Sequence, residues 1–294
     1  MSSSPTRVTD RATATATAGS VPRTAAMLGA SFVVALGILA ASAYGLLAAH
    51  PYRSLPEATV LGARGQDVGS VLVAVLLVAL VRSRVLTPAR FLAWLGLLAY
   101  VVYSYAIYLT GVPMNRVFLV YVVLESAAGA ALLGGLWRLT TMPWPDAAPT
   151  RLRRGTGWLL VVVAGLFAGL WLSTLLPVAL TAGTADPEGV GGAPYPVFVL
   201  DLVVVLPSVA AVGVLLLRGH RLGPPLAVVV LIKILTLFAA LWAGPAYALA
   251  TDGPVHLGPD AGPSLLLLVV SAWLLVAWSR TFHPRTTEHQ EVPR

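Results

Sequence analysis

Three ionisable side chains lie inside long apolar segments of this chain, where a charge is energetically costly. They are Glu125, Asp201 and Lys233, and Lys233 is the only lysine among the 294 residues. Ionisable groups within membrane spans usually face a bundle interior or a water-filled cavity, and they mark pathways for protons, ions or solutes. These three residues therefore predict an ion- or proton-responsive site, or alternatively a structural ion pair that holds helices together.

The depth of each charge in a membrane can be estimated from about 1.5 Å of rise per helical residue. Lys233 falls near the midplane, and Glu125 falls within roughly one helical turn of it. Asp201 falls closer to the outer end of its own helix. We therefore expect Glu125 and Lys233 to share a polar interior site, with Asp201 nearer its outer mouth.

A proline lies close to one of these charges. Pro207 follows Asp201 by six residues, and a proline inside a helix leaves the carbonyl four residues before it, here that of Val203, without a donor. A carboxylate one turn from a free carbonyl would suit a cation or a substrate amine. The alternative is that Pro207 only kinks its helix.

Further polar and aromatic residues gather toward the expected outer half of the bundle. With the three charges, the candidates for lining an outward-facing pocket are Gln66, Asp67, Tyr100, Tyr103 and Asn115. Tyr100, Tyr103, Ser104 and Tyr108 share one broad face of a helix. An interfacial belt of aromatic residues is the alternative, and it accounts for Tyr108 better than for Tyr100, which lies near mid-membrane.

The elements that must position these residues are eight apolar segments. About 20 apolar residues cross the 30 Å core of a bilayer as a helix. The segments are 25–48, 67–82, 89–110, 117–137, 156–180, 196–217, 223–248 and 263–280. The predicted fold class is therefore all-α, a polytopic membrane protein with eight transmembrane helices, in which Asp67 lies near an interface.

The arginines fix the expected orientation of these helices. Fifteen of the 18 arginines fall in the tails and in every second loop, and the other three are Arg53, Arg64 and Arg116. Because positively charged loops stay on the cytosolic side, both termini should be cytosolic. We expect a cytosolic disordered tail at 1–22, a transmembrane domain at 23–282 and a second cytosolic tail at 283–294. The alternative is cleavage of a signal peptide after Ala41-Ser42-Ala43, which would leave seven helices.

The amino-acid composition also indicates a membrane protein and not a soluble one. Hydrophobic residues make up 57% of the chain and charged residues 11%, whereas soluble domains carry about 25% charged residues. The net charge of +7 lies in loops beside apolar segments, so it indicates topology and not nucleic-acid binding. The alanine- and arginine-rich composition is typical of a bacterial inner-membrane protein. Its expected surroundings are the lipid bilayer, and the sequence does not indicate an oligomeric state.

Several chemistries are absent from the sequence. The chain has no cysteine, which excludes disulfides and thiolate metal sites. It contains no HExxH, GxSxG or P-loop motif, and its five histidines all fall outside the expected helix interiors. We expect no metal and no cofactor. A lysine in a late helix is also found in retinal-binding proteins, but the residues around Lys233 lack the aspartate that those helices usually carry.

Spacing along the chain suggests an internal duplication. Asp67 and Asp201, Arg82 and Arg218, and Gly111 and Gly244 are separated by 134, 136 and 133 residues. A near-constant offset predicts a 4+4 repeat of parallel orientation, with a binding site at the repeat interface. The alternative is that any eight helices with short loops would align in this way.

Small residues at a spacing of four predict where helices approach closely. Such stripes occur at Ser126, Ala130 and Gly134 and at Gly165 and Gly169. We expect them to pack inside the bundle, and contact between subunits of an oligomer is the alternative.

The sequence leaves the function open between two main classes. The first is a secondary transporter or channel for a small solute or ion. The second is a non-transporting sensor, scaffold or subunit of a membrane assembly. An enzyme acting on a membrane substrate comes third, and an enzyme is not the expected class.

Overall fold

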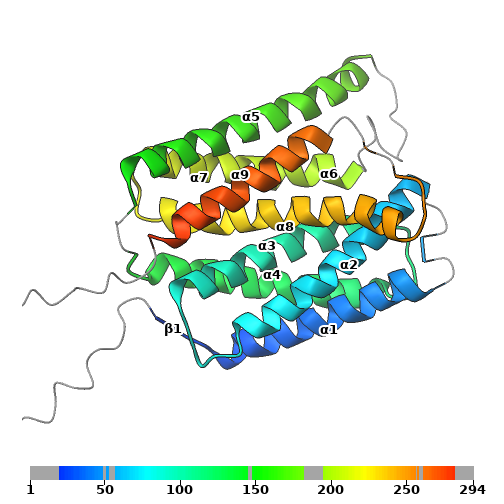
Figure 1. Cartoon of the computed structure of the whole chain (residues 1–294), viewed down its shortest axis with the longest axis horizontal. Helices are drawn as coiled ribbons and strands as arrows, with labels where there is room; N and C mark the ends of the chain where they lie inside the picture. Colours follow the sequence, from blue (N-terminus) through cyan, green and yellow to red (C-terminus); the bar gives the residue numbers. More distant parts are fainter. Residues whose placement is uncertain are drawn as a thin grey trace, which may run out of the picture.

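The computed structural model of the chain is a bundle of long helices that run roughly along one direction (Figure 1). It describes residues 20–48, 51–52, 57–144, 148–181, 195–255, 257 and 261–281. The expected tails at 1–22 and 283–294 therefore lie almost entirely outside the described residues, as does Arg53.

Eight spans among the described residues are long and apolar enough to cross a membrane. Seven are the single helices α1 (Ala25–Leu47), α2 (Glu57–Leu80), α3 (Pro88–Gly111), α4 (Phe118–Thr141), α5 (Thr150–Leu180), α8 (Gly223–Ala250) and α9 (Ala261–Ser279). The eighth is built from α6 (Tyr195–Leu200), the π-helix η1 (Asp201–Val205) and α7 (Leu206–Leu217). This architecture fits a multi-pass membrane protein.

The outward faces of these helices are covered by large apolar side chains. Leu36, Leu72, Leu133, Leu166 and Leu266 are all exposed. In water such a surface would drive aggregation, whereas in a bilayer it contacts lipid chains of equal polarity.

Two helices begin at threonine caps. The Thr24 side chain accepts a hydrogen bond of 3.1 Å from the backbone N–H of Met27 at the start of α1. The Thr87 side chain accepts one of 3.3 Å from Arg90 at the start of α3, where Pro88 occupies the first turn. Both caps satisfy N–H groups that lack a partner within the helix.

The second helix begins earlier than the sequence suggests. We expected it to start at residue 67, but α2 starts at Glu57 and carries the polar motif Arg64-Gly65-Gln66-Asp67 inside the helix. Gly65 explains why this segment is packed, because a Cβ there would overlap the backbone of Gly244 on α8. The backbones of α2 and α8 therefore approach closely at this point.

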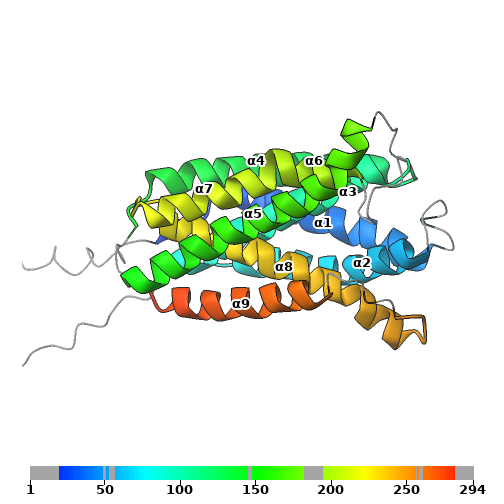
Figure 2. The same cartoon turned by 90° about the horizontal axis from the view of Figure 1, so that it is seen from above.

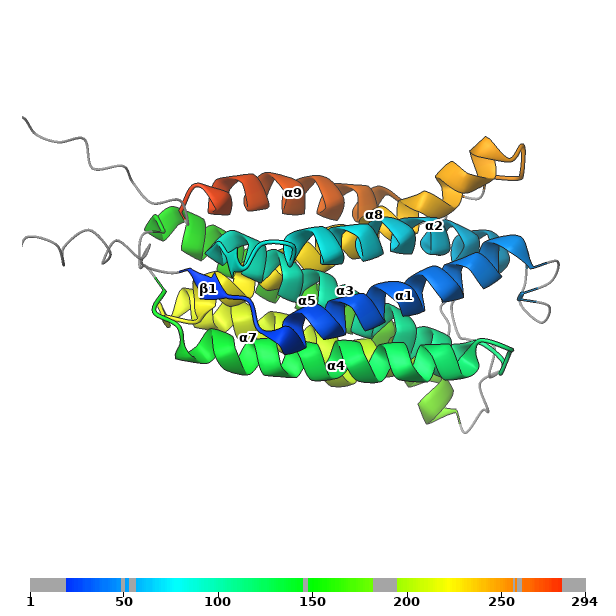
Figure 3. The same cartoon turned by 90° about the horizontal axis from the view of Figure 1, so that it is seen from below.

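The helix α8 lies inside the bundle and packs against α2, α3, α7 and α9. The helix α5 packs chiefly against α7 on one outer edge, and α1 lies on the opposite edge, where it contacts α2 and α4 (Figure 1). The other two views show α4 and α9 on opposite sides of the bundle (Figures 2 and 3).

A short strand pair lies at one end of the bundle. β1 (Val21–Pro22) pairs antiparallel with β2 (Val85–Leu86), between α2 and α3. Arg23 reinforces the pair, since its guanidinium donates to the carbonyl oxygen of Val81 at 3.1 Å. The last turn of α9 lies at the same end (Figures 1 and 3).

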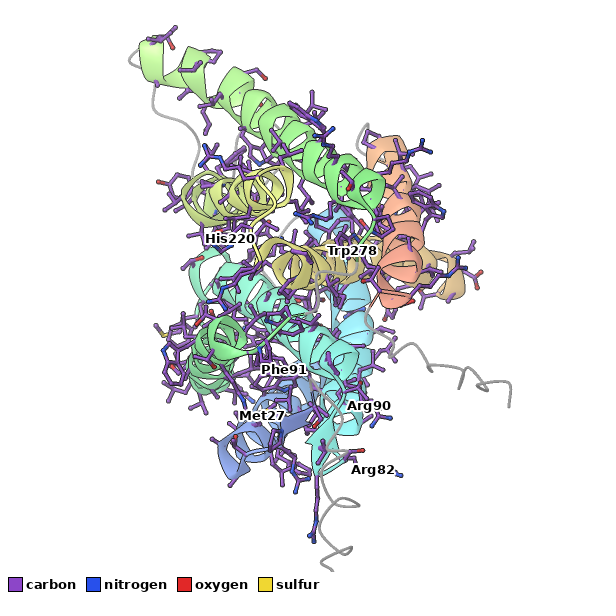
Figure 4. All side chains as sticks on the ribbon, turned by 90° about the vertical axis from the view of Figure 1, so that its left-hand side faces the viewer. Met27, Arg82, Arg90, Phe91, His220 and Trp278 are labelled. Atoms are coloured by element: carbon purple, nitrogen blue, oxygen red, sulfur yellow. The ribbon has the colours of Figure 1, made fainter. Side chains whose placement is uncertain are left out.

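This end also holds most of the described arginines. Figure 4 looks onto it and labels Arg82, Arg90, His220 and Trp278. The described arginines at this end are Arg23, Arg82, Arg84, Arg90, Arg138, Arg151, Arg153, Arg154, Arg218, Arg221 and Arg280. The first and last described elements therefore share one end of the bundle with the arginine-rich loops.

The small-residue stripes do not lie where we expected them. Ser126, Ala130 and Gly134 are exposed on α4, and Gly165 and Gly169 are exposed on α5. No atom lies within 4 Å of a Cβ built on Gly134, Gly165 or Gly169. That prediction is wrong, because spacing alone does not say which face of a helix meets the bundle.

Candidate functional site

The buried lysine lies against a tyrosine from the other half of the chain. Lys233, in the first half of α8, is 8% exposed, and its Nζ lies 4.0 Å from the ring centroid of Tyr103 on α3. An ammonium over an aromatic face is attracted by the negative charge density of the ring. Lys233 and Tyr103 meet because α3 and α8 pack closely, with Gly96 of α3 against Ile232 of α8.

Asp201 is the carboxylate next to this lysine. It opens η1, is 8% exposed and interacts electrostatically with Lys233 and with Tyr103. Its Oδ2 accepts a hydrogen bond of 2.9 Å from the indole N–H of Trp171 on α5. The Trp171 ring is held in turn by an edge contact with Phe198, at a centroid distance of 5.0 Å.

We call Tyr103, Trp171, Asp201 and Lys233 the α3–α8 site. It combines a carboxylate, an ammonium, a phenol and an indole in an otherwise apolar environment. The carboxylate already has a donor in Trp171. Among the residues that the structure describes, none accepts a hydrogen bond from the ammonium, which contacts the ring of Tyr103.

A π-helical turn places Asp201 in this site. Within η1 the backbone N–H of Leu206 bonds to the carbonyl of Asp201, five residues back. Such turns are rare in helices and often occur at functional sites. The side chains of Val203 and Pro207 are exposed, whereas Asp201 is buried. The Pro207 side chain therefore faces away from the carboxylate, and a cation site at Asp201 and the Val203 carbonyl stays a prediction.

The expected pairing of Glu125 with Lys233 is wrong. Glu125 is on α4, which packs against α1 and α3, and the electrostatic partner of Lys233 is Asp201. Glu125 is half-buried, and among the described residues its Oε2 has no hydrogen-bond partner. The next residue toward the N-terminus, Leu124, packs on Gly37 of α1. Glu125 therefore lies in a different part of the bundle from Lys233.

Asp67 forms a second buried polar group, at the other end of the bundle from β1. It is 2% exposed, and its Oδ2 accepts a hydrogen bond of 2.7 Å from the hydroxyl of Tyr52, in the connection between α1 and α2. Burial and the nearby carboxylate raise the pKa of Tyr52 well above its usual value, so its hydroxyl keeps the proton that it donates. Gly45 leaves the space for this carboxylate, since a Cβ there would overlap Asp67. Asp67 is therefore buried and hydrogen-bonded, and its position near an interface stays a prediction.

The tyrosines of α3 divide between the two groups. The Tyr100 hydroxyl lies 3.5 Å from that of Ser70 on α2, whereas Tyr103 faces Lys233. Tyr108 stacks against Tyr105 at 5.5 Å between ring centroids and donates to the carbonyl oxygen of Ala63 at 3.3 Å. The single aromatic face that we expected is thus split by the packing of α2 and α8 on α3.

The remaining candidates lie outside the α3–α8 site. Gln66 is half-buried on α2 beside Asp67 in sequence. The Asn115 side chain accepts a hydrogen bond of 3.0 Å from the backbone N–H of Val117, which shapes the turn before α4. Sequence reasoning missed Trp171 and Tyr52, because nothing in their neighbourhoods distinguishes them from other aromatic residues near a membrane.

No group of three or more metal-binding side chains occurs in the described part of the chain. Comparisons with protein families, with curated proteins and with solved structures find no match for this chain. The assignment of a function therefore depends on the site itself.

Proposed function

We propose that the protein is a secondary carrier for a small solute, with the α3–α8 site as its binding and coupling site. The observation that carries the proposal is the burial of Lys233 and Asp201 together between helices from both halves of the chain. Charged groups are rare inside membrane bundles and mostly serve ion or solute pathways. A structural role alone would favour apolar side chains of similar size at both positions.

In a 4+4 repeat the binding site lies at the interface between the two halves, as the α3–α8 site does. Two contacts between the halves support such a repeat. A Cβ on Gly244 of α8 would lie 3.2 Å from Gly62 of α2, and a Cβ on Gly111 of α3 would lie 3.0 Å from Pro196 of α6. Gly62 and Pro196 are 134 residues apart, and Gly111 and Gly244 are 133 apart. Replacing each residue by its equivalent in the other half therefore converts the contact of Gly62 with Gly244 into that of Pro196 with Gly111. A two-fold axis between the halves requires this relationship.

A third contact lies where such an axis would pass. A Cβ on Gly96 of α3 would lie 3.0 Å from the carbonyl oxygen of Val229 on α8, and these residues are 133 positions apart. Contact between two equivalent positions of the halves, such as Gly96 and Val229, is expected only close to a two-fold axis. An offset of 134 residues relates Asp67 and Asp201, which are both buried in the second helix of their half.

The two halves differ in the packing of their first and last helices and in the helix that carries the buried aspartate. The helix α1 packs closely against α4, whereas its counterpart α5 has little contact with α9. Only the second half has a π-helix at its buried aspartate. Parallel repeats of carriers place their substrate at the interface between halves, and interrupted helices commonly form it. These features favour the α3–α8 site, and not the Asp67 group, as the substrate site.

The test is transport by the purified protein in liposomes. Uptake would be followed for a panel of chloride, nitrate, lactate, glycine, glucose, choline and potassium, with Lys233→Met and Asp201→Asn as site variants. Tyr121→Phe is a suitable control, because the buried Tyr121 hydroxyl has no partner among the described residues. We expect saturable uptake of at least one solute that both site variants lose and the control keeps.

Two results would overturn the proposal. Flux that does not saturate would indicate a channel. No flux of any solute, with variants that fold normally, would favour a sensor, a scaffold or a subunit of a membrane assembly.

A further inference from the structure

We propose that the substrate is a small monovalent anion, bound by the Lys233 ammonium and carried together with one proton that Asp201 takes up. This inference rests on the carrier function and names the chemistry of its substrate. It follows from which groups of the α3–α8 site already have partners and which do not.

The Lys233 ammonium is the group that lacks a hydrogen-bond acceptor among the described residues. Lys233 is more than nine-tenths buried, and its three N–H donors have no acceptor among the residues described. The Tyr103 ring stabilises the charge but accepts no conventional hydrogen bond. A buried ammonium is stable when an anion balances its charge or when several acceptors take its hydrogen bonds. An anionic solute would supply both the charge and the acceptors.

The Asp201 carboxylate, in contrast, already interacts with hydrogen-bond donors. Trp171 donates to its Oδ2, and the Tyr103 hydroxyl and the Lys233 ammonium interact with it. A cationic solute would have to displace these donors, and it would be repelled by Lys233. The arrangement therefore disfavours amines and metal cations as substrates.

Charge balance links the anion to a proton. An ammonium on Lys233 and a carboxylate on Asp201 would give the empty site no net charge. A bound monovalent anion would leave one net negative charge inside the membrane, where it is costly. If Asp201 takes one proton from water as the anion binds, the loaded site is again neutral. One O–H bond of a hydronium ion breaks and the O–H bond of the Asp201 carboxyl group forms, so that one proton moves with each anion.

The surroundings of the site contain few other groups that could take this proton. α7 and α9 carry no titratable residue, and Trp171, the contribution of α5, is not titratable. α3 contributes Tyr103, whose phenol is a far weaker acid than a carboxyl group. On α2, Asp67 is engaged by Tyr52 and interacts with Arg64. Asp201 is thus the carboxylate in position to couple the proton.

The experiment uses liposomes that contain the full-length protein and an internal pH dye. Inward gradients of lactate, chloride or nitrate are compared with gradients of choline and glucose. We expect an anion gradient to drive proton uptake at one proton per anion, without a change when valinomycin and potassium clamp the membrane potential. The lactate arm and the two inorganic arms distinguish a carboxylate from an inorganic anion as the substrate.

Two variants assign the roles. Lys233→Met should reduce anion uptake about thirtyfold or more, as expected for loss of one partner of a buried charge contact, and Lys233→Arg should restore part of it. Asp201→Asn should lose net uptake of the anion together with the proton, and it should retain only proton-independent exchange of internal for external anion. Tyr121→Phe should behave like the wild type in both measurements.

If a variant fails to fold, uptake by the wild-type protein still tests the substrate and the coupling. Saturable uptake of choline or glucose instead of an anion would overturn the anion assignment and leave the carrier function standing. Anion uptake that carries net charge, or that moves no proton, would overturn the coupling. Absence of uptake for every solute would contradict the carrier function itself.

Discussion

Lys233 and Tyr103 lie on different halves of the chain, and the lysine ammonium is 4.0 Å from the centre of the tyrosine ring. The contact joins α8 to α3, which pack along each other in the middle of the bundle. Through Asp201 and Trp171 it extends to η1 and α5. Any movement of the two halves against each other would therefore change the surroundings of the only lysine in the chain.

The seam between α2 and α8 gives a first prediction. Gly65→Ala should lower the thermal unfolding temperature in detergent by about 5 °C, because the added methyl overlaps the backbone of Gly244 and overpacking typically costs about 1–3 kcal/mol. Gly165→Ala is the matched control, since nothing lies within 4 Å of its Cβ. It should leave the temperature unchanged or slightly higher. Equal shifts for the two variants would mean that α2 and α8 do not approach at Gly65.

The number of spans could be predicted because hydrophobicity is a local property of a segment. All eight expected segments correspond to apolar spans in the structure. The start of α2 could not be predicted, because Arg64 and Asp67 resemble a loop in the sequence, whereas in the structure α8 packs on Gly65 and α1 packs on Asp67. Here a tertiary contact, made through Gly65, decides where the helix begins.

The second prediction concerns which end of the bundle faces the cytosol. The chain has no cysteine, so single cysteines can be introduced directly. Met114→Cys lies in the exposed turn between α3 and α4, and Thr141→Cys lies at the arginine-rich end. A maleimide that does not cross membranes should label Met114→Cys in intact cells and Thr141→Cys only after lysis. The reverse pattern would invert the topology.

The site could be predicted only in part, because depth along a helix does not determine its facing direction. Glu125 and Asp201 were both candidates as partners of Lys233. The structure places Asp201 beside Lys233, and it places Glu125 on α4, against α1 and α3. Trp171 gave no signal, since its role depends on how α5 packs on α7 and η1.

The Tyr52–Asp67 contact gives the third prediction. Tyr52→Phe and Asp67→Asn should each destabilise the protein, because each removes a buried hydrogen bond to a carboxylate. In a double-mutant cycle the coupling energy should be about 1.5–3 kcal/mol. Urea unfolding in mild detergent would measure it. A coupling near zero would show that the two side chains do not interact in solution.

The fourth prediction concerns the stability of the α3–α8 site and separates it from its activity. Asp201→Asn removes the carboxylate charge that acts on the Lys233 ammonium and should lower the free energy of unfolding by about 1–3 kcal/mol. Adding Lys233→Met removes the stranded charge, so the double variant should return to within about 1 kcal/mol of the wild type. It should nevertheless show no transport, because neither charge remains to bind or couple a solute. Unfolding in detergent and uptake by liposomes would be measured on the same preparations. Losses of stability that simply add would mean that the residues do not interact, and a double variant that still transports would place the substrate elsewhere in the bundle.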